Sequence, residues 1–383
     1  MTLSDAELVA AAVRGHRAWM ARGAETHDEP GLLWTLAAHR LDIAFPELAS
    51  CDAGGRIDAI LAAGRGAGVP EAACWSVLPS PTEHLSALLV ARGFEIGWRP
   101  HWMGLELAAL PADRPPAGVA VELHSADGVH RALARRGAAV LGTALMAVEG
   151  AAGSIFDLNV EGAERRRGIG WTLTHRLCAQ GAREGVRHVT LNATGDGERL
   201  YSAMGFRSLG FGQTWWMHRP ALRAAPPPPR VVAYVEAIAC GDVAALEAAG
   251  AALEPGEGEA RLLNGRTPLQ QAVESGQPRT AAWLVDHGAE LDVLMAWLLG
   301  WRERAAALLT DRPDLRDRLL EADITPLHAA AEHDDADLAR LLLDAGADPT
   351  RRKPGFDGTP LDWARHLGHD AVAAVLAEAA PAG

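Results

Sequence analysis

The sequence predicts a mixed α/β region followed by an all-α array of helical repeats. Between Asp157 and Phe206, a strand, a glycine-containing turn, a helix, a second strand and a second helix follow one another. Farther along, the tripeptide Thr-Pro-Leu recurs, beginning at residues 267, 325 and 359. Strands that alternate with helices are typical of α/β domains, and a repeat period of roughly 20 to 50 residues is typical of stacked helical units.

The α/β unit is predicted from hydrophobic periodicity. An apolar run over residues 154–160 predicts the first strand. Apolar residues then recur at helical spacing after the glycines, at Ile169, Leu173 and Leu177. They alternate along a second expected strand, at Val189, Leu191 and Ala193. A short helix is expected over residues 198–204, and Gly205 is placed to end it.

The turn before the first of these helices reads Arg165-Arg166-Arg167-Gly168-Ile169-Gly170. Glycines in a first helical turn let backbone N–H groups approach an anion, and the positive helix end favours it further. By itself Arg-x-x-Gly-x-Gly is a weak pattern, because short glycine motifs are common in turns. Its position between a strand and an apolar helix makes a phosphate-binding loop the leading hypothesis. A charged surface loop is the alternative.

Residues 117–220 resemble the GNAT superfamily of N-acetyltransferases. The glycine turn matches the family's acetyl-CoA pyrophosphate motif, and Tyr201-x-x-x-Gly205-Phe206 matches its tyrosine and glycine-phenylalanine pair, although Thr194 stands where members often have asparagine. The resemblance implies a GNAT fold of the α/β (α+β) class and acetyl-CoA as the acyl donor. It also implies cofactor contacts at Leu158, Asn159 and Val160 and at Arg165, Arg166, Arg167, Gly168, Ile169 and Gly170.

The chemistry that this resemblance implies needs three kinds of group. A neutral amine attacks a thioester carbonyl, backbone N–H groups hold the oxyanion, and the departing thiolate takes a proton. By resemblance, residues 158–160 supply the N–H groups where two central strands splay apart, and Tyr201 is the candidate acid. The alternative role for Tyr201 is a packed pocket wall. Asp157 is the leading candidate for the base, ahead of Glu149, His124, His130 and His175.

Residues 1–112 contain a weaker copy of the Leu200 to Phe206 pattern. Leu88 to Phe94, followed by Trp102, parallels Leu200 to Phe206 followed by Trp216. This resembles the degenerate N-terminal half of tandem GNAT proteins. Because Leu89 stands where Tyr201 stands, this half is predicted neither to bind the cofactor nor to donate a proton.

The second half is short for a complete GNAT domain, because the expected strands at 119–123 and 140–145, with the segment between them, take up only 27 residues. Complete domains usually place two helices there, so the first half is expected to supply the acceptor side of the cleft. Tryptophans are the candidate pocket residues, with ordinary core packing as the alternative: Trp34, Trp75, Trp98, Trp102, Trp215 and Trp216.

A proline-rich linker over residues 221–230 leads into residues 231–383, which are identified as about five ankyrin repeats from the signature Thr325-Pro326-Leu327-His328-Ala329-Ala330. Thr325 and His328 are predicted to be structural. Four residues after the signature are candidates for partner contact, with a solvated acidic face as the alternative: Glu332, His333, Asp334 and Asp335.

Composition narrows the class of protein. The net charge is −13, and the excess of Asp and Glu lies within residues 231–383, which disfavours nucleic acid as a partner of that region. The four cysteines lack the clustering of a zinc site or a disulfide framework, so no metal is expected. The chain shows neither a long apolar run nor a secretion signal, so we expect a cytoplasmic protein without membrane contact. A single lysine and abundant alanine suggest a bacterial, GC-rich origin.

Three functions remain open at this point. The first is an N-acetyltransferase acting on a small or peptidic primary amine, antibiotic-like amines included, with the repeats shaping substrate or partner binding. The second is a transferase whose protein substrate is recruited by the acidic array. The third is a non-catalytic acyl-CoA-binding scaffold in which the repeats carry the function.

Overall fold

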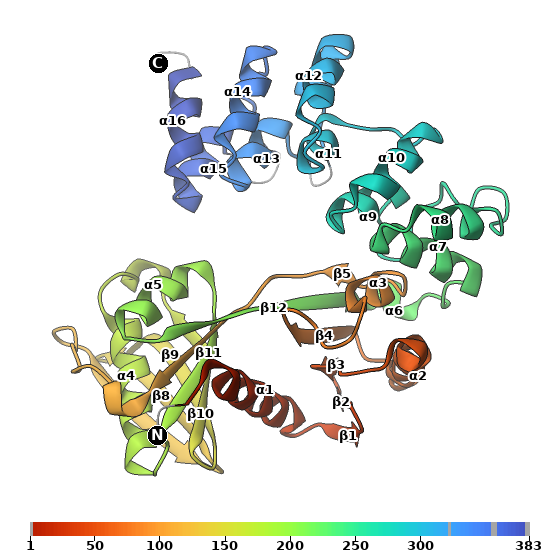
Figure 1. Ribbon diagram of the computed structural model, residues 1–383. Helices are drawn as coiled ribbons and strands as arrows, with labels where there is room; N and C mark the ends of the chain where they lie inside the picture. Colours follow the sequence, from red (N-terminus) through yellow and green to blue (C-terminus); the bar gives the residue numbers. More distant parts are fainter. Residues whose placement is uncertain (1–2, 321–322, 354–357, 380–383) are drawn as a thin grey trace. The chain divides into compact units, whose positions relative to one another are not determined.

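The computed structural model describes residues 3–320, 323–353 and 358–379, and it contains two compact units that divide after Pro226 (Figure 1). The first unit is a mixed α/β domain and the second is helical, which confirms the predicted fold class. The division falls inside the predicted linker, but that linker is shorter than expected. Helix α6 ends at Arg223 and helix α7 begins at Pro229, so only residues 224–228 lie outside helices.

The first half of the α/β unit begins with a long helix and continues through strands and two shorter helices. The Ser4 hydroxyl caps the first helix by accepting from the Glu7 N–H, and the Glu7 carboxylate accepts from the Ser4 N–H. The elements are α1 (Asp5–Ala21), β1 (Glu25–Glu29), β2 (Leu32–Ala37), β3 (Arg40–Ala44), α2 (Ser50–Ala67), β4 (Glu71–Val77), α3 (Leu85–Val90), β5 (Glu95–Ile96), β6 (His101–Glu106) and the 3-10 turn η1 (Leu107–Ala109).

The second half repeats the element order of the first half. In each half a group of strands is followed by a helix, a strand, a second helix and a final strand. Its elements are β7 (Ala120–Ala126), β8 (Val129–Arg136), β9 (Ala139–Glu149), β10 (Ala152–Val160), η2 (Gly162–Glu164), α4 (Ile169–Arg183), β11 (His188–Ala193), α5 (Gly195–Ala203), β12 (Arg207–His218) and α6 (Arg219–Arg223). Strand β8 fills the interval after β7 through a tight turn at Asp127 and Gly128, and no helix lies there.

The two halves share one sheet because each passes a strand to the other. The strand order is β1-β2-β3-β4-β12-β6-β11-β10-β9-β8-β7, with β5 paired to β12. Strand β6 of the first half lies between β11 and the start of β12. The end of β12 pairs with β4 of the first half, as at Trp215 opposite Cys74. The halves therefore form one folding unit.

Helices cover both faces of the second half's sheet, and they come from different parts of the chain. Helix α4 packs its apolar stripe on β8, β9 and β10, where Leu173 and Leu177 are fully buried with Ile155. Helix α1 packs on the opposite face, against β9, β10 and β11. Successive side chains of a strand point to opposite faces, so Ser154 meets α1 while Ile155 meets α4. A Cβ added at Gly15 of α1 would lie 2.1 Å from the Ser154 Oγ.

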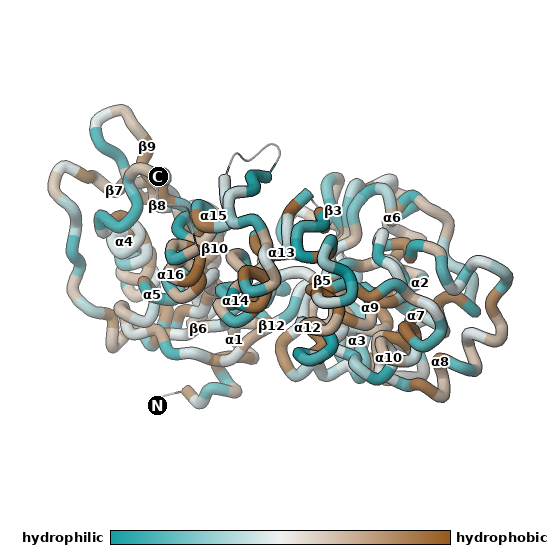
Figure 2. The backbone as a smooth tube through the Cα atoms, turned by 90° about the horizontal axis from the view of Figure 1, so that it is seen from above, coloured by the Kyte–Doolittle hydropathy of each residue, from teal (hydrophilic) through white to brown (hydrophobic). Residues whose placement is uncertain are grey.

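The second unit contains five helix pairs within the described residues. The helices are α7 (Pro229–Cys240), α8 (Val243–Gly250), α9 (Pro268–Glu274), α10 (Pro278–Asp286), α11 (Val293–Leu298), α12 (Arg302–Asp311), α13 (Pro326–Glu332), α14 (Ala336–Asp344), α15 (Pro360–Leu367) and α16 (Asp370–Ala379). A 3-10 turn, η3 (Pro313–Arg316), follows α12. Figure 2 shows hydrophobic segments within α13 and α14, where leucines and alanines are buried.

Threonine residues begin three helices of this array in the same way. Thr267, Thr325 and Thr359 each accept a bond from the N–H three residues on, and proline occupies the first helical turn. His328 Nδ1 shares a hydrogen bond with the Thr325 hydroxyl. Its Nε2 lies 3.2 Å from the carbonyl oxygen of Gly358, in the next repeat. Thr325 and His328 therefore serve helix capping and the packing of neighbouring repeats.

Two of the four residues proposed for partner contact are used inside the array instead. Asp335 accepts from the N–H of Leu338 and from the indole of Trp297, and Asp334 accepts from the N–H of Val372. Glu332 and His333 are exposed. The two aspartates thus have structural roles in the array, but Asp334 is also exposed, and partner contact at these four positions stays a prediction.

Within the described residues, none of the helices has the length and apolar character that crossing a membrane requires. In the same part of the chain, no group of three or more His, Cys, Asp or Glu side chains is arranged to hold a metal ion. Cys74 and Cys178 are buried thiols, and burial raises the pKa of the Cys178 thiol to about 12. The side chain of Cys51 lies outside the described set.

Candidate active site

Strands β10 and β11 run parallel and then separate. Their pairing extends from Ala152 opposite His188 to Ile155 opposite Leu191, and it stops there. On its other side β10 has an irregularity between Phe156 and Asn159, where its register with β9 shifts and Asp157 takes a φ of 52°. Backbone groups of residues 156–160 on the β11 side are thereby freed from sheet pairing. They line an opening between the strands.

The glycine turn lies at the start of α4, directly after β10. Gly168 is the N-cap residue with a φ of 84°, a conformation that favours glycine, and the helix begins at Ile169. The first N–H groups of a helix have no partner within it, and they carry the positive end of the helix dipole. Arg165 and Arg166 flank this end and face the same opening. The turn thus offers several N–H donors and positive charge to an anion.

Gly170 keeps the turn close to its neighbours. A Cβ at this position would lie 3.1 Å from a Leu200 methyl group and 3.7 Å from one of Leu158. Gly170 belongs to the helix start, Leu200 to α5 and Leu158 to the splayed part of β10. A side chain at position 170 would therefore occupy the space that these three elements leave open.

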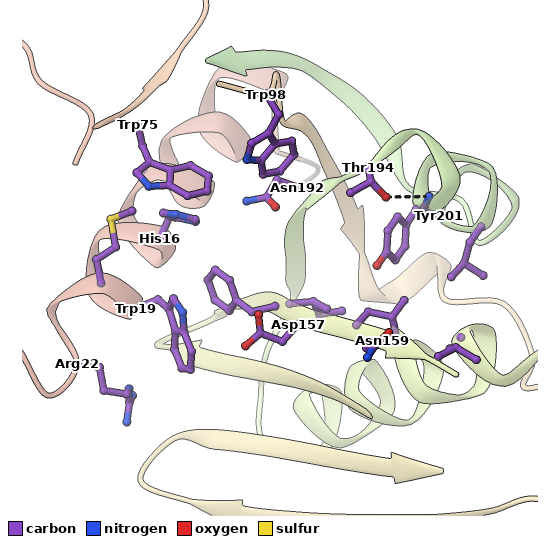
Figure 3. Close-up of a pocket in the computed structure, with 18 of the residues that line it drawn as sticks. His16, Trp19, Arg22, Trp75, Trp98, Asp157, Asn159, Asn192, Thr194 and Tyr201 are labelled. Carbon is purple, nitrogen blue, oxygen red and sulfur yellow. Dashed lines mark hydrogen bonds between the residues drawn. The ribbon is translucent and has the colours of Figure 1, made fainter. Parts of the chain in front are cut away.

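Tyr201 closes the other side of the opening. Its ring packs edge to face on Phe206, with centroids 5.5 Å apart, and only 6% of the residue is exposed. Figure 3 shows its hydroxyl pointing into the pocket, toward the strand that carries Asp157 and Asn159. Burial raises the pKa of Tyr201 well above its ordinary value, and the neighbouring Cys178 thiol adds to that shift. The hydroxyl therefore stays protonated at neutral pH.

These groups line one pocket of about 830 Å³ that lies between the two halves of the α/β unit. The pocket runs from the glycine turn, past the splayed end of β10, to α1 and the sheet face of the first half. A volume of this order accommodates a cofactor arm together with a small second substrate. The arrangement can hold an anion at one end and deliver a protonated hydroxyl near the middle.

A comparison with protein-family models identifies the same region. Residues 99–206 match the acetyltransferase (GNAT) family, and residues 264–295 and 323–354 match the ankyrin repeat.

The chain carries a GNAT acetyltransferase domain and ankyrin repeats.

The GNAT match lies within the α/β unit. The chain is similar to a solved GCN5-related N-acetyltransferase from Kribbella flavida, with 16% identity, a TM-score of 0.46 and coverage of 57% of this chain and 96% of that one. A tandem GNAT protein from the clavulanic acid biosynthesis pathway shares 15% identity, with a TM-score of 0.39 and coverage of 59% and 98%. A GCN5-related N-acetyltransferase from Sphaerobacter thermophilus shares 13% identity, with a TM-score of 0.39 and coverage of 58% and 95%. No curated protein sequence matches the chain.

Most residues proposed for cofactor contact line the 830 Å³ pocket: Leu158, Asn159, Val160, Arg165, Arg166, Gly168, Ile169 and Gly170. Arg167 is absent from the lining. Its guanidinium lies 3.4 Å from Glu164, which also forms a two-point ion pair with Arg136 on β8. Consecutive residues of a turn point in different directions, so three neighbouring arginines cannot all face one ligand.

Of the five candidates for the general base, one lines the pocket. Asp157 lines the GNAT pocket and is exposed to it. The four alternatives lie elsewhere: Glu149 ends β9, His124 lies on exposed β7, His130 pairs with Glu184 at 3.0 Å and His175 faces Asp113 at 3.7 Å. Thr194 lines the pocket while it caps α5 by accepting from the Gly197 N–H.

Two of the six candidate tryptophans line the pocket, and the alternative, core packing, describes the other four. Trp75 and Trp98 line the pocket. The other four pack elsewhere: Trp34 stacks on His27, Trp102 contacts Phe45, Trp215 donates to the Ser86 hydroxyl, and Trp216 lies edge to face on Trp75. Alternation along a strand decides which tryptophan faces the cavity, and the sequence does not reveal which face that is.

Sequence reasoning missed the contribution of α1 and β3. His16 and Trp19 come from α1, and Asp42 comes from β3, and all three line the pocket. Burial lowers the pKa of His16 to about 3, with a further contribution from Arg40, so the imidazole is neutral. Burial raises the pKa of Asp42, and the Arg40 guanidinium opposes that shift. No motif in the sequence indicates which sheet α1 covers.

Proposed function

We propose that this GNAT domain transfers the acetyl group of acetyl-CoA to the nitrogen of a primary amine. The observation that carries the proposal is the single pocket that joins the glycine turn, the splayed strand β10 and the Tyr201 hydroxyl. The free N–H groups at the start of α4, with Arg165 and Arg166, fit a diphosphate. A side chain at Gly170 would press on Leu200 and on Leu158 of the splayed strand, so glycine here keeps the turn and β10 in their present positions.

Acetyl-CoA supplies an activated acetyl group as a thioester. The amine nitrogen forms a bond to the carbonyl carbon, and the carbon–sulfur bond breaks. Backbone N–H groups of residues 158–160, which the end of β10–β11 pairing frees, are placed to stabilise the oxyanion. Tyr201 donates its proton to the departing thiolate. Asp157, exposed to the pocket, takes the proton that the amine loses, directly or through water.

The ankyrin array is assigned to partner binding. Every residue that lines the pocket lies between His16 and Tyr201, inside the α/β unit. The array carries the negative excess of the chain, so a partner with a basic surface suits it.

A glycine pair tests the cofactor site. Gly170→Ala is expected to weaken CoA binding about tenfold, because the methyl group enters the space at the helix start. Gly162→Ala is the matched control, since nothing lies within 4 Å of its added Cβ. Calorimetry with CoA gives the affinity, and release of free thiol from acetyl-CoA with a panel of amines gives turnover. Equal CoA affinities of the two variants would place the diphosphate elsewhere, and binding without turnover for any amine would favour a non-catalytic scaffold.

A further inference from the structure

The segment that joins the two halves of the α/β unit lies against the first turn of α4. Residues 110–119 connect η1 with β7, and three prolines restrict the backbone there. The Thr172 Oγ1 lies 3.5 Å from the carbonyl oxygen of Arg114, and a Cβ added at Gly168 would lie 3.7 Å from the same oxygen. Arg114 is therefore placed beside the glycine turn.

Asp113 holds the same segment on α4. Its carboxylate lies 2.8 Å from Nε of Arg176 and 3.7 Å from Nδ1 of His175, both on that helix. Its other oxygen accepts from the Arg114 N–H at 2.8 Å. The charge of Asp113 is thus balanced by α4, and the backbone of Arg114 is fixed before any ligand arrives.

The Arg114 guanidinium is exposed, and it stacks on a ring. Its Cζ lies 4.7 Å from the centroid of the Trp171 ring. In the described part of the chain no carboxylate lies at ion-pair distance from it, whereas Arg136 and Arg167 both pair with Glu164. A guanidinium has five N–H donors in a planar fork that matches the oxygens of a phosphate. At Arg114 these donors remain available to a ligand.

Trp171 connects this cation to the pocket. It is the third residue of α4, and it lines the pocket of about 830 Å³ together with the glycine turn. The residue is 8% exposed, and its Nε1 is buried without a hydrogen-bond partner among the described residues. Because a buried indole N–H is almost always paired in a folded protein, it indicates an acceptor oxygen that a ligand supplies. The pair of Arg114 and Trp171 is thus continuous with the anion-binding end of the pocket.

The glycine turn gives a bound nucleotide its direction. A Cβ at Gly170 would meet Leu158 of the splayed strand, whereas a Cβ at Gly168 would meet Arg114. With the thioester at the splayed strand and the diphosphate on the turn, CoA extends its nucleotide toward Arg114. The ribose of that nucleotide carries the diphosphate at its 5′ oxygen and a terminal phosphate at its 3′ oxygen. A terminal phosphate offers the oxygens that a planar arginine fork binds best.

We propose that Arg114 binds the 3′-phosphate of CoA, so that the protein selects CoA over 3′-dephospho-CoA. Trp171 holds the guanidinium in place by stacking, and the ion pairs of Asp113 with α4 hold the segment that carries it. This inference rests on the proposed acetyltransferase function and identifies what recognises the nucleotide end of the same cofactor.

Two nucleotides that differ by one phosphate test the inference. With the full-length protein at constant ionic strength, calorimetry is expected to show CoA bound about tenfold more tightly than 3′-dephospho-CoA, because one charge-assisted contact is lost. In Arg114→Ala the ratio is expected to fall toward one, through a loss of CoA affinity alone. Arg183→Ala is the matched control, because it removes the same charge from an exposed position at the far end of α4 and keeps the ratio.

The outcomes separate this inference from the proposed function. Equal affinities of the wild-type protein for the two nucleotides would overturn the inference and leave the CoA site intact. A preference for CoA that Arg114→Ala retains would assign the phosphate to another group and reject the role of Arg114. If neither nucleotide binds, the proposed transferase function fails together with the inference. Melting temperatures confirm that both variants are folded.

Discussion

Tyr201 combines an apolar setting with a hydroxyl that faces the pocket, and burial holds its pKa above the ordinary value of 10.0. A raised pKa keeps the proton on the phenol, so loss of activity through Tyr201 ionisation is expected only above pH 10.0. Tyr201→Phe is expected to lower kcat about a hundredfold with CoA affinity unchanged, because the ring stays and the proton donor goes.

The chain offers a matched control for that experiment. Its other tyrosine, Tyr234, is also buried and also has a pKa raised by burial, but it lies in α7 of the ankyrin unit. Tyr234→Phe removes the same hydroxyl and is expected to leave kcat as it was. A Tyr201→Phe enzyme with undiminished kcat would make Tyr201 a pocket wall and not an acid.

His16 links the pocket to the acid stability of the fold. The folded protein holds its pKa near 3, whereas an unfolded histidine titrates at about 6.5, so between these values only the unfolded state takes up the proton. Stability is therefore unaffected above pH 6.5 and decreases as the pH falls from 6.5 toward 3. The loss from this one group is about 4 kcal/mol at the acid end.

Urea unfolding across that pH range measures the effect. His16→Phe is expected to flatten the acid slope of the free energy of unfolding, while His39→Phe, at an exposed position, is expected to keep it. Parallel slopes for wild type and His16→Phe would show that His16 accepts a proton in the folded state.

At the scale of elements, the exchanged strands β6 and β12 join the two halves of the α/β unit. Gly212, where β12 passes from one half to the other, has no room for a side chain: a Cβ would lie 2.6 Å from the Trp102 indole nitrogen and 2.7 Å from the Ser76 carbonyl. Gly212→Ala is expected to destabilise the whole unit by about 2 kcal/mol in a single transition, because the backbone carbonyl cannot move aside.

Chemical unfolding followed by tryptophan fluorescence checks this expectation. Gly66→Ala in α2, where nothing lies within 4 Å of the added Cβ, is the control and is expected to leave stability unchanged or raised. Two separate transitions in the Gly212→Ala protein would mean that the halves fold independently in spite of their shared sheet.

At the scale of the whole molecule, the pocket and the ankyrin array belong to different units. All lining residues of the pocket precede Pro226, where the units divide. A protein truncated after Pro226 is therefore expected to bind CoA and to acetylate a small amine with kcat/KM within about twofold of the full chain. Thiol release measures the rate. A large rise in KM for the amine on truncation would give the array a part in acceptor binding.

Short sequence motifs were enough to predict part of the pocket lining. The glycine turn, the tyrosine three residues before Met204 and the ankyrin threonines were recognisable because each needs particular residue types at short spacing. Turns and helix caps are determined by residues that are adjacent in the sequence. Residues 158–160 and Gly168 to Gly170, which the motif indicated, line one pocket, and their contact with a phosphate group stays a prediction.

The sequence indicated that the first half contributes to the pocket, but not that α1 and β3 do so. His16, Trp19 and Asp42 are brought to the pocket by α1 crossing onto the second half's sheet and by the exchange of β6 and β12. The facing of Trp75 toward the cavity and of Arg167 away from it depends on strand alternation and turn geometry.

The sequence by itself determined the fold class, the family of the catalytic half and the anion-binding turn, since these depend on local periodicity and short motifs. Only the tertiary structure decided which residues of α1 and β3 line the pocket, because the pairing of strands distant in the chain arises when the whole unit packs.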